Sequence, residues 1–311
     1  DMTKDEDGLW SVTTPPAVPG LHGYFLVVDG VRLNDAIGKT YGSVKMTTNG
    51  VEIPEPGVTF YDIKDVPHGQ VRIQWYYSKI GNAWRRCYVY VPAEYDQNPN
   101  KRYPVFILRH GGGEDETSWV EQGRANFIMD NLIAEGKARP MIVVMDWGQV
   151  PRPDEPVHIP STPPPHYIGE VLVKELIPMI DANFRTISDR ENRAMAGLSM
   201  GSVQTLYFGL EYSDKFSYLG MFSRRIMDEK EFNLNSFGGV FKDPEGLNKK
   251  LKLFWWGAGT AEEGIYNATK ANLAELAAVG INSVFVEFPG TSHEWQTWRR
   301  SLYDFAQRLF R

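Results

Sequence analysis

The sequence predicts an α/β protein with a doubly wound, mostly parallel sheet over residues 71–311, preceded by a small all-β unit over residues 1–70. From about residue 71, short apolar runs alternate with stretches of helical length, which is typical of a sheet covered by helices on both faces. Before residue 71, short strand-like runs are separated by turn dipeptides such as Asp29-Gly30 and Asn49-Gly50. This pattern indicates a small immunoglobulin-like sandwich.

The individual elements follow from these patterns. In the all-β unit, we expect strands at 9–13, 23–28, 31–34, 51–53 and 58–61. The second unit opens with a hairpin at 71–79 and 87–92, and later strands are expected at 105–108, 141–145, 193–198, 251–256 and 283–288. Helices are expected at 124–136, 170–183, 203–210, 269–279 and 294–310. A proline-rich segment at 148–166 interrupts the alternation and is predicted to be a lid.

Composition and charge exclude several classes of function. The formal net charge of −6 argues against a nucleic-acid partner, because such proteins usually carry a basic face. No apolar run reaches the roughly 18 residues of a membrane helix. Residues 1–12 lack the features of a signal peptide, so any export signal is expected to have been removed. Cys87 is the only cysteine and is expected to be a buried structural thiol. We expect no catalytic metal and no cofactor.

The run Gly197-Leu198-Ser199-Met200-Gly201 is the strongest chemical signal. It follows one predicted strand and precedes a predicted helix, which is the context in which G-x-S-x-G presents a nucleophilic serine in an α/β-hydrolase sheet. The glycines permit a sharp turn that lifts the hydroxyl above the sheet edge, near the positive end of the next helix. Ser199 is therefore the predicted nucleophile, and the predicted fold is an α/β-hydrolase.

A serine hydroxyl needs a base and an acid that orients this base. His293 lies just after the predicted strand at 283–288, at the edge of the sheet where ligands bind, and it is the predicted base. In this fold the acid lies between the serine and the histidine in the chain. Glu262 is favoured, three residues after Gly259, and Glu263 is the alternative that the spacing leaves open.

The tetrahedral intermediate of ester hydrolysis carries a negative oxygen that needs backbone N–H donors. The run His110-Gly111-Gly112-Gly113 follows the predicted strand at 105–108, so its backbone can approach a substrate closely. We predict that Gly112 N–H and Met200 N–H form this oxyanion hole, against the alternative of a plain turn. His110 itself is expected to be structural.

Other histidines and one arginine pair receive less specific interpretations. The structural or exposed histidines are assigned to the all-β unit and to the lid: His22 and His68, and His158 and His166. The pair Arg224-Arg225 is interpreted as structural or solvated, rather than as a contact for an acidic substituent.

Three runs taken together resemble carbohydrate esterase family one, which includes feruloyl esterases and acetylxylan esterases: His110-Gly111-Gly112-Gly113-Glu114-Asp115-Glu116, Gly197-Leu198-Ser199-Met200-Gly201 and His293-Glu294-Trp295-Gln296-Thr297-Trp298-Arg299. The likeness covers most of residues 71–311. It implies hydrolysis of esters between a hydroxycinnamate such as ferulate and an arabinoxylan of the plant cell wall, by a secreted or periplasmic protein. Many members of the family have an aspartate as the acid, whereas this chain has Glu262.

The all-β unit resembles a second family through two runs: Asp7-Gly8-Leu9-Trp10-Ser11-Val12-Thr13 and Tyr24-Phe25-Leu26-Val27-Val28-Asp29-Gly30. These are similar to the early-set sandwich of glycogen-binding or family forty-eight carbohydrate-binding modules. The resemblance implies that residues 1–70 are such a module, incomplete at its N-terminus. Whether it binds glycan or only supports the catalytic unit is left open.

The resulting hypothesis is a serine feruloyl esterase that uses a Ser199–His293–Glu262 triad. Three alternatives stay open at this point. An acetylxylan esterase would need only a small acyl pocket, and an acyltransferase would pass the acyl group to an alcohol instead of water. A non-catalytic glycan-binding protein would carry a relict esterase fold.

Overall fold

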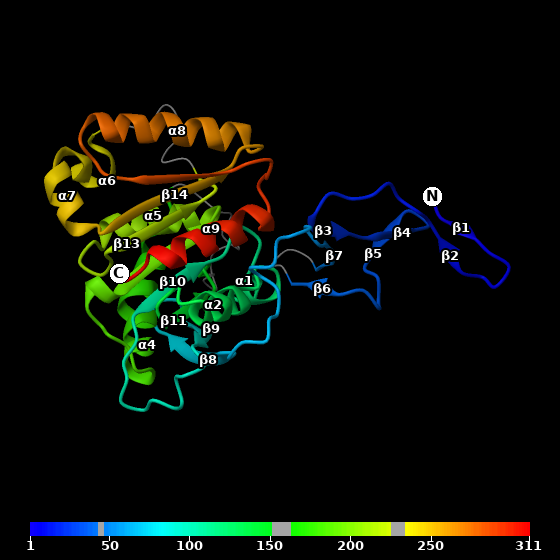
Figure 1. The fold of residues 1–311 in the computed structure, drawn as a ribbon, viewed down its shortest axis with the longest axis horizontal. Coiled ribbons are helices and arrows are strands. Elements are labelled where there is room, and N and C mark those ends of the chain that lie inside the picture. The colour runs from blue at the N-terminus through cyan, green and yellow to red at the C-terminus, as the bar shows by residue number, and fades with distance from the viewer. Residues whose placement is uncertain (43–46, 151–162, 225–233) are drawn as a thin grey trace.

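The computed structural model describes residues 1–42, 47–150, 163–224 and 234–311. One large sheet with helices on both faces makes up the main body, and the strands of the N-terminal region extend from one side of it (Figure 1). The order of the eight strands in the large sheet is β15-β14-β13-β12-β10-β11-β9-β8. The chain thus has the predicted α/β fold class preceded by an all-β region.

The strands of the large sheet are β8 (Gln70–Ser78), β9 (Ala83–Val91), β10 (Val105–Arg109), β11 (Ile142–Asp146), β12 (Arg193–Leu198), β13 (Tyr218–Phe222), β14 (Leu253–Gly259) and β15 (Val284–Phe288). The three strands β8, β9 and β11 pair antiparallel, and all other neighbours pair parallel. Every residue of β10 to β13 is buried. This explains their continuous apolar sequences, because both faces of these strands are covered.

The helices are α1 (Ser118–Glu121), α2 (Ala125–Ala134), α3 (His166–Val171), α4 (Ile177–Asn183), α5 (Met200–Glu211), α6 (Ser236–Gly239), α7 (Pro244–Lys250), α8 (Glu263–Ala278) and α9 (Trp295–Arg308). Single turns of other helix types lie at Leu172–Leu176, Arg190–Asn192 and Val240–Lys242. One apolar core contains α3 to α5 and α8 on one face of the sheet, and a second contains α2 and α9 on the other. Alternate residues of β10 enter each core, as the period of a strand requires.

The described residues of the N-terminal region form three small antiparallel sheets rather than one continuous sandwich. Its strands are β1 (Thr3–Lys4), β2 (Trp10–Ser11), β3 (Gly20–Tyr24), β4 (Leu26–Val28), β5 (Val31–Leu33), β6 (Thr40–Tyr41) and β7 (Thr48–Ile53). The all-β character predicted for this region is confirmed. The strand predicted at 58–61 is wrong, because this segment forms turns and Tyr61 enters the core beneath α9.

One largely buried ion pair and one partly exposed ion pair fix the N-terminal region to α9. The guanidinium of Arg299 donates to both carboxylate oxygens of Glu52 at 2.7 and 2.9 Å, and it lies over the ring of Tyr61. Arg300 makes a second pair with Glu55. A bidentate pair that is shielded from water holds both partners in one geometry. The position of β7 relative to α9 is therefore well defined.

Two differences from the predicted elements matter for the site. Strand β13 was not predicted, although it lies between β12 and β14 and ends at the same edge of the sheet as β12. Helix α8 begins at Glu263, six residues before the predicted start at 269. Strand β13 leads directly to Ser223, and the earlier start of α8 leaves Glu262 just before the helix.

Candidate active site

Ser199 stands on a strained turn between β12 and α5. Its backbone φ is 49° and its ψ is −111°, a conformation that non-glycine residues rarely adopt. A Cβ on Gly197 would lie 2.6 Å from the carbonyl carbon of Gly201, and a Cβ on Gly201 would lie 2.6 Å from the oxygen of His110. Only glycine fits these two positions, which explains the spacing of the motif. The turn places the Ser199 side chain at the carboxyl end of a central strand, where the sequence predicts the nucleophile.

His293 and Glu262 meet at the same edge of the sheet. The two residues follow the neighbouring strands β15 and β14, and Nδ1 of His293 lies 2.9 Å from Oε2 of Glu262. The Glu262 side chain is 1% exposed, whereas that of His293 is 40% exposed. Glu263 is exposed and starts α8. Of the two acids that the spacing leaves open, the structure pairs Glu262 with the histidine.

The carboxylate of Glu262 is held by several donors. Its Oε1 accepts hydrogen bonds from the Ser223 hydroxyl at 2.7 Å and from the Gly259 N–H at 3.0 Å. A fixed carboxylate facing Nδ1 selects the tautomer in which Nδ1 carries the proton, so that Nε2 is left to accept one.

Two residues that the sequence did not single out support this pair. Ser223 follows β13, and its oxygen accepts the indole N–H of Trp298 at 3.0 Å. The ring of Trp298 also packs edge-on against the imidazole of His293, with the ring centres 5.1 Å apart. Trp298 belongs to the run that begins at His293, whereas Ser223 was missed because β13 was not predicted.

In the described part of the chain, Ser199 makes no hydrogen bond to His293. Catalytic hydrogen bonds are often long in the absence of substrate and tighten when it binds. The structure therefore brings His293 and Glu262 together directly and places Ser199 at the same edge of the sheet.

The glycine-rich loop after β10 lies against the turn that carries Ser199. Arg109 at the end of β10 pairs with Gly197 in β12. A Cβ on Gly111 would come within 2.4 Å of the Leu198 side chain, so the two loops are in close contact. The N–H of Gly111 donates to the Glu114 carboxyl at 2.8 Å, and Gly112 is exposed.

His110 holds this loop in place through contacts of both ring nitrogens with backbone groups. Its Nδ1 lies 2.8 Å from the Gly111 oxygen, and its Nε2 accepts the Gly148 N–H at 2.9 Å. Burial lowers the pKa of His110 to about 4, which keeps the imidazole neutral at physiological pH. The Gly148 oxygen in turn accepts a hydrogen bond from Gln204 on α5 at 2.7 Å. His110 is structural, because its two ring nitrogens serve backbone groups.

Glu114 is the titratable group next to the loop. Removal of its carboxyl from water raises its pKa to about 7, and the neighbouring Asp115 acts in the same direction. The Gly111 N–H and the nearby His293 oppose this rise. A carboxyl that titrates near neutral pH therefore lies beside the proposed catalytic base.

The other predicted positions are placed elsewhere or lie outside the described residues. His22 contacts the Val18 oxygen at 2.7 Å, His68 lies 2.9 Å from Asp130, and His166 lies 2.8 Å from Glu211. Cys87 is buried, and burial raises its pKa, as a structural thiol requires. His158, Arg225 and most of the segment predicted to be a lid fall within 151–162 and 225–233, which are not described.

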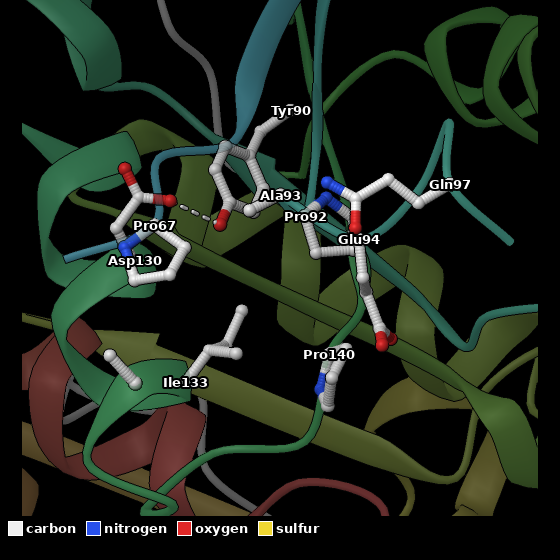
Figure 2. A pocket seen from close by; sticks show the side chains of 10 residues that line it. Pro67, Tyr90, Pro92, Ala93, Glu94, Gln97, Asp130, Ile133 and Pro140 are labelled. Atoms are coloured by element: carbon white, nitrogen blue, oxygen red, sulfur yellow. Dashed lines mark hydrogen bonds between the residues drawn. The ribbon is translucent and has the colours of Figure 1, made fainter.

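A separate hollow lies at the opposite edge of the sheet (Figure 2). It is lined by Tyr90, Pro92 and Asp130, among others, and Tyr90 pairs with Val143 near the start of β11. Asp130 accepts hydrogen bonds from the Tyr90 hydroxyl at 2.7 Å and from the Gly69 N–H at 2.8 Å. Its carboxylate is therefore engaged in holding the fold, away from Ser199.

The described residues, 1–42, 47–150, 163–224 and 234–311, were searched for groups that could bind a metal ion and for helices that could span a membrane. In these ranges no group of three or more His, Cys, Asp or Glu residues is placed to hold a metal ion. In the same ranges no helix combines the length and the apolar character needed to cross a bilayer.

Comparisons with known proteins identify the family of this chain. A family model described as "Putative esterase" matches residues 78–309. The whole chain is 38% identical over 317 aligned residues to an endo-1,4-beta-xylanase/feruloyl esterase of Xylanibacter ruminicola, of which it covers 41%. It is 24% identical over 252 residues to endo-1,4-beta-xylanase Y of Acetivibrio thermocellus, covering 74% of this chain and 22% of that protein. The chain thus spans less than half the length of these curated relatives.

Solved structures show the same fold. A ferulic acid esterase from Anaeromyces mucronatus in complex with ferulic acid superposes with a TM-score of 0.68 and 26% identity, covering 84% of this chain and 98% of that one. The feruloyl esterase module of Clostridium thermocellum, complexed with sinapinate, gives a TM-score of 0.65 at 22% identity, covering 83% and 93%. These likenesses confirm the predicted α/β-hydrolase fold.

Proposed function

The chain belongs to the Esterase family, and on this basis we propose that it is a serine esterase that removes feruloyl groups from plant cell-wall arabinoxylan. The observation that carries the proposal is the hydrogen-bonded pair of Glu262 and His293, at the sheet edge where the strained turn presents Ser199. This is the set of groups that activates a serine towards an ester.

The reaction proceeds through an acyl-enzyme. Ser199 Oγ attacks the ester carbonyl carbon while His293 Nε2 takes the hydroxyl proton, and Glu262 stabilises the resulting imidazolium. The bond to the sugar oxygen then breaks, and His293 returns the proton to the leaving hydroxyl. Water then attacks the acyl carbon with His293 again as base, the bond to Ser199 Oγ breaks, and His293 returns the proton to Oγ as the free acid leaves.

We assign the oxyanion hole to the N–H groups of Gly112 and Met200. Gly111 is an unsuitable donor because its N–H is already bound by Glu114. Met200 starts α5, and the first N–H groups of a helix have no partner within the helix and point towards negative charge. Gly112 is the next residue of the loop that contacts the Ser199 turn.

The feruloyl specificity rests on the comparisons. A relative that is 38% identical carries feruloyl esterase in its name, and a structural neighbour at 26% identity holds ferulic acid. The same resemblance supports arabinoxylan or its oligosaccharides as the partner and a secreted or periplasmic location. We also propose that residues 71–311 form the esterase unit and that residues 1–70 form a module similar to a carbohydrate-binding module.

The test compares three substrates in the natural protein and in Ser199→Ala. Methyl ferulate is expected to be hydrolysed faster than p-nitrophenyl acetate or acetylated xylan, and Ser199→Ala is expected to abolish hydrolysis of all three. Retained hydrolysis in Ser199→Ala would refute the mechanism. A preference for acetylated xylan would instead identify an acetylxylan esterase, and acyl transfer to added alcohol in place of hydrolysis would identify an acyltransferase.

A further inference from the structure

Three aromatic side chains are exposed on one face of the hairpin formed by β8 and β9. Trp75, Tyr77 and Trp84 are 54%, 47% and 68% exposed. Trp75 and Tyr77 alternate along β8, and Tyr77 is the cross-strand partner of Trp84. Residues that alternate on a strand, or that pair across two strands, share a face. These three residues are called the aromatic strip below.

The strip has a defined shape. The rings of Tyr77 and Trp84 lie 5.7 Å apart at an angle of 75°, so they form a corner instead of a stack. Trp75 and Tyr77 are separated by about 7 Å, the distance between alternate residues of a strand. The guanidinium of Arg86 lies 5.6 Å from the centre of the Trp75 ring. The Tyr77 hydroxyl donates to Asn82 at 2.6 Å, so polar groups border the apolar surface.

The strip lies at the catalytic edge of the sheet. Cys87 in β9 pairs antiparallel with Asp146, the last residue of β11, so the start of β9 and the end of β8 lie where the parallel strands end. Ser199 follows the end of β12 at that same edge. Strand β9 is three positions from β12 in the sheet, at about 4.8 Å for each position. The strip and Ser199 are thus close enough for one extended ligand to reach both.

A polar contact connects the strip to the glycine-rich loop. Arg86, the cross-strand partner of Trp75, donates through Nε to the carboxylate of Glu116. Glu116 is buried and belongs to the same loop as Gly112. Arg86 therefore links the strip directly to the loop that borders the Ser199 turn.

An exposed row of large aromatic residues on an edge strand is unfavourable unless something binds it. Strand β8 is the last strand of the sheet in the described part of the chain, and edge strands with apolar surfaces promote aggregation. Natural edge strands usually carry charged residues for this reason. Aromatic rings with a polar border are instead typical of binding surfaces.

We propose that the aromatic strip binds the sugar backbone of a polysaccharide, while the acyl group attached to that backbone enters the site at Ser199. Pyranose rings present flat C–H faces that pack on aromatic rings, and their hydroxyls can bond to groups such as Asn82 and Arg86. The inference rests on the proposed function, because a polymer-borne ester needs its main chain held near the nucleophile. It assigns to β8 and β9 a role in substrate choice.

The first experiment separates small from polymeric substrates. The double variant Trp75→Ala/Trp84→Ala is expected to lower kcat/KM on feruloylated arabinoxylan about tenfold, because each lost aromatic contact costs a modest free energy. The value for methyl ferulate, which has no sugar chain, is expected to stay within about twofold, which also shows that the variant folds. Trp84→Tyr keeps an aromatic ring and should retain most of the polymer activity.

Two controls match the exposure of the strip. Ile63→Ala removes an equally exposed apolar side chain, and Trp10→Ala removes an exposed indole from β2. Ile63→Ala is expected to leave the hydrolysis of both substrates unaffected, whereas Trp10→Ala tests whether the N-terminal region contributes to polymer binding. If Trp10→Ala lowers polymer activity and the strip variant does not, the N-terminal region binds the sugar chain and the proposal is wrong.

The second experiment does not depend on ester hydrolysis. In the Ser199→Ala background, binding to insoluble arabinoxylan stripped of its esters is measured by depletion from solution. The strip variant is expected to bind about tenfold more weakly than its parent. Unchanged binding would overturn the proposal. So would sedimentation in which the parent protein is a dimer and the strip variant a monomer, because the strip would then be a contact between two copies of this chain. If the natural protein does not hydrolyse methyl ferulate, the proposed function is refuted. The binding assay still tests the aromatic strip in that case, because it does not depend on ester hydrolysis.

Discussion

The hydroxyl of Ser223 donates a 2.7 Å hydrogen bond to Oε1 of Glu262, while Oε2 of the same carboxylate faces His293 at 2.9 Å. Ser223 has a left-handed backbone, with a φ of 57°, and its oxygen also accepts the Trp298 indole N–H. One oxygen of the acid is thus fixed by a residue outside the recognised motifs. The other oxygen is free to orient the imidazole.

The choice between the two candidate acids is directly testable. Glu262→Gln is expected to lower kcat on methyl ferulate by about 10⁴-fold, because the amide favours the wrong imidazole tautomer and cannot stabilise the imidazolium. Glu263→Gln is the matched control, since Glu263 is exposed on α8, and it should leave kcat unchanged. A loss confined to Glu263→Gln would move the role of acid to that residue.

Ser223 is expected to act through Glu262 without touching the substrate. Ser223→Ala removes a hydrogen bond to a buried carboxylate, and such bonds contribute about 1.5–3 kcal/mol. We expect kcat to fall about tenfold with KM unchanged, because orientation of the base matters most in the transition state. Steady-state kinetics on methyl ferulate measure this split. A rise in KM with kcat preserved would contradict a positioning role.

Glu114 makes stability depend on pH near neutrality. Its pKa rises from the ordinary 4.5 to about 7 on folding, so the folded chain holds this proton more tightly than the unfolded chain. Its contribution to stability is therefore present below about pH 4.5 and is lost as the pH rises to about 7. Glu114→Gln cannot titrate and should flatten this part of the profile. Urea unfolding between pH 4.5 and 8 provides the measurement, and equal slopes in both proteins would disprove the assignment.

The ion pair between Arg299 and Glu52 is expected to contribute more to stability than the ion pair between Arg300 and Glu55. Glu52→Ala leaves the buried guanidinium of Arg299 without its bidentate partner, which should lower the free energy of unfolding by about 3 kcal/mol. Glu55→Ala breaks the more exposed pair with Arg300 and should cost less than about 1 kcal/mol. Denaturant titrations of the two variants test this ranking, which equal losses would contradict.

Sequence alone predicts those site features that depend on a short run of neighbouring residues. The turn at Ser199 could be predicted because G-x-S-x-G between a strand and a helix is a local signal, even though Gly201 is also required by the nearby His110 oxygen. The choice between Glu262 and Glu263 could not, because it depends on whether α8 starts before or after each residue, and helix ends are poorly determined by pattern. Glu262 precedes the helix and turns inward, whereas Glu263 begins it and faces solvent.

Other features depended on contacts between distant segments. Strand β13 is five residues long and has no glycine or proline at its flanks, so its role in placing Ser223 was not visible. The turn at 58–61 has the apolar residues of a strand, but Tyr61 is drawn into the core beneath Arg299. The alternation of Trp75 and Tyr77 is evident in the sequence. Only the tertiary structure shows that solvent, and not a helix, covers that face.

Helix α9 starts two residues after His293 and carries Arg299 and Arg300, which hold Glu52 and Glu55 of the N-terminal region. The predicted base His293 and the N-terminal region are therefore both tied to α9. A chimera that replaces residues 1–70 by an unrelated segment would lose both carboxylates and leave the buried guanidinium of Arg299 without its acidic partner. We expect such a replacement to be tolerated only if Arg299 and Arg300 are exchanged together with that segment.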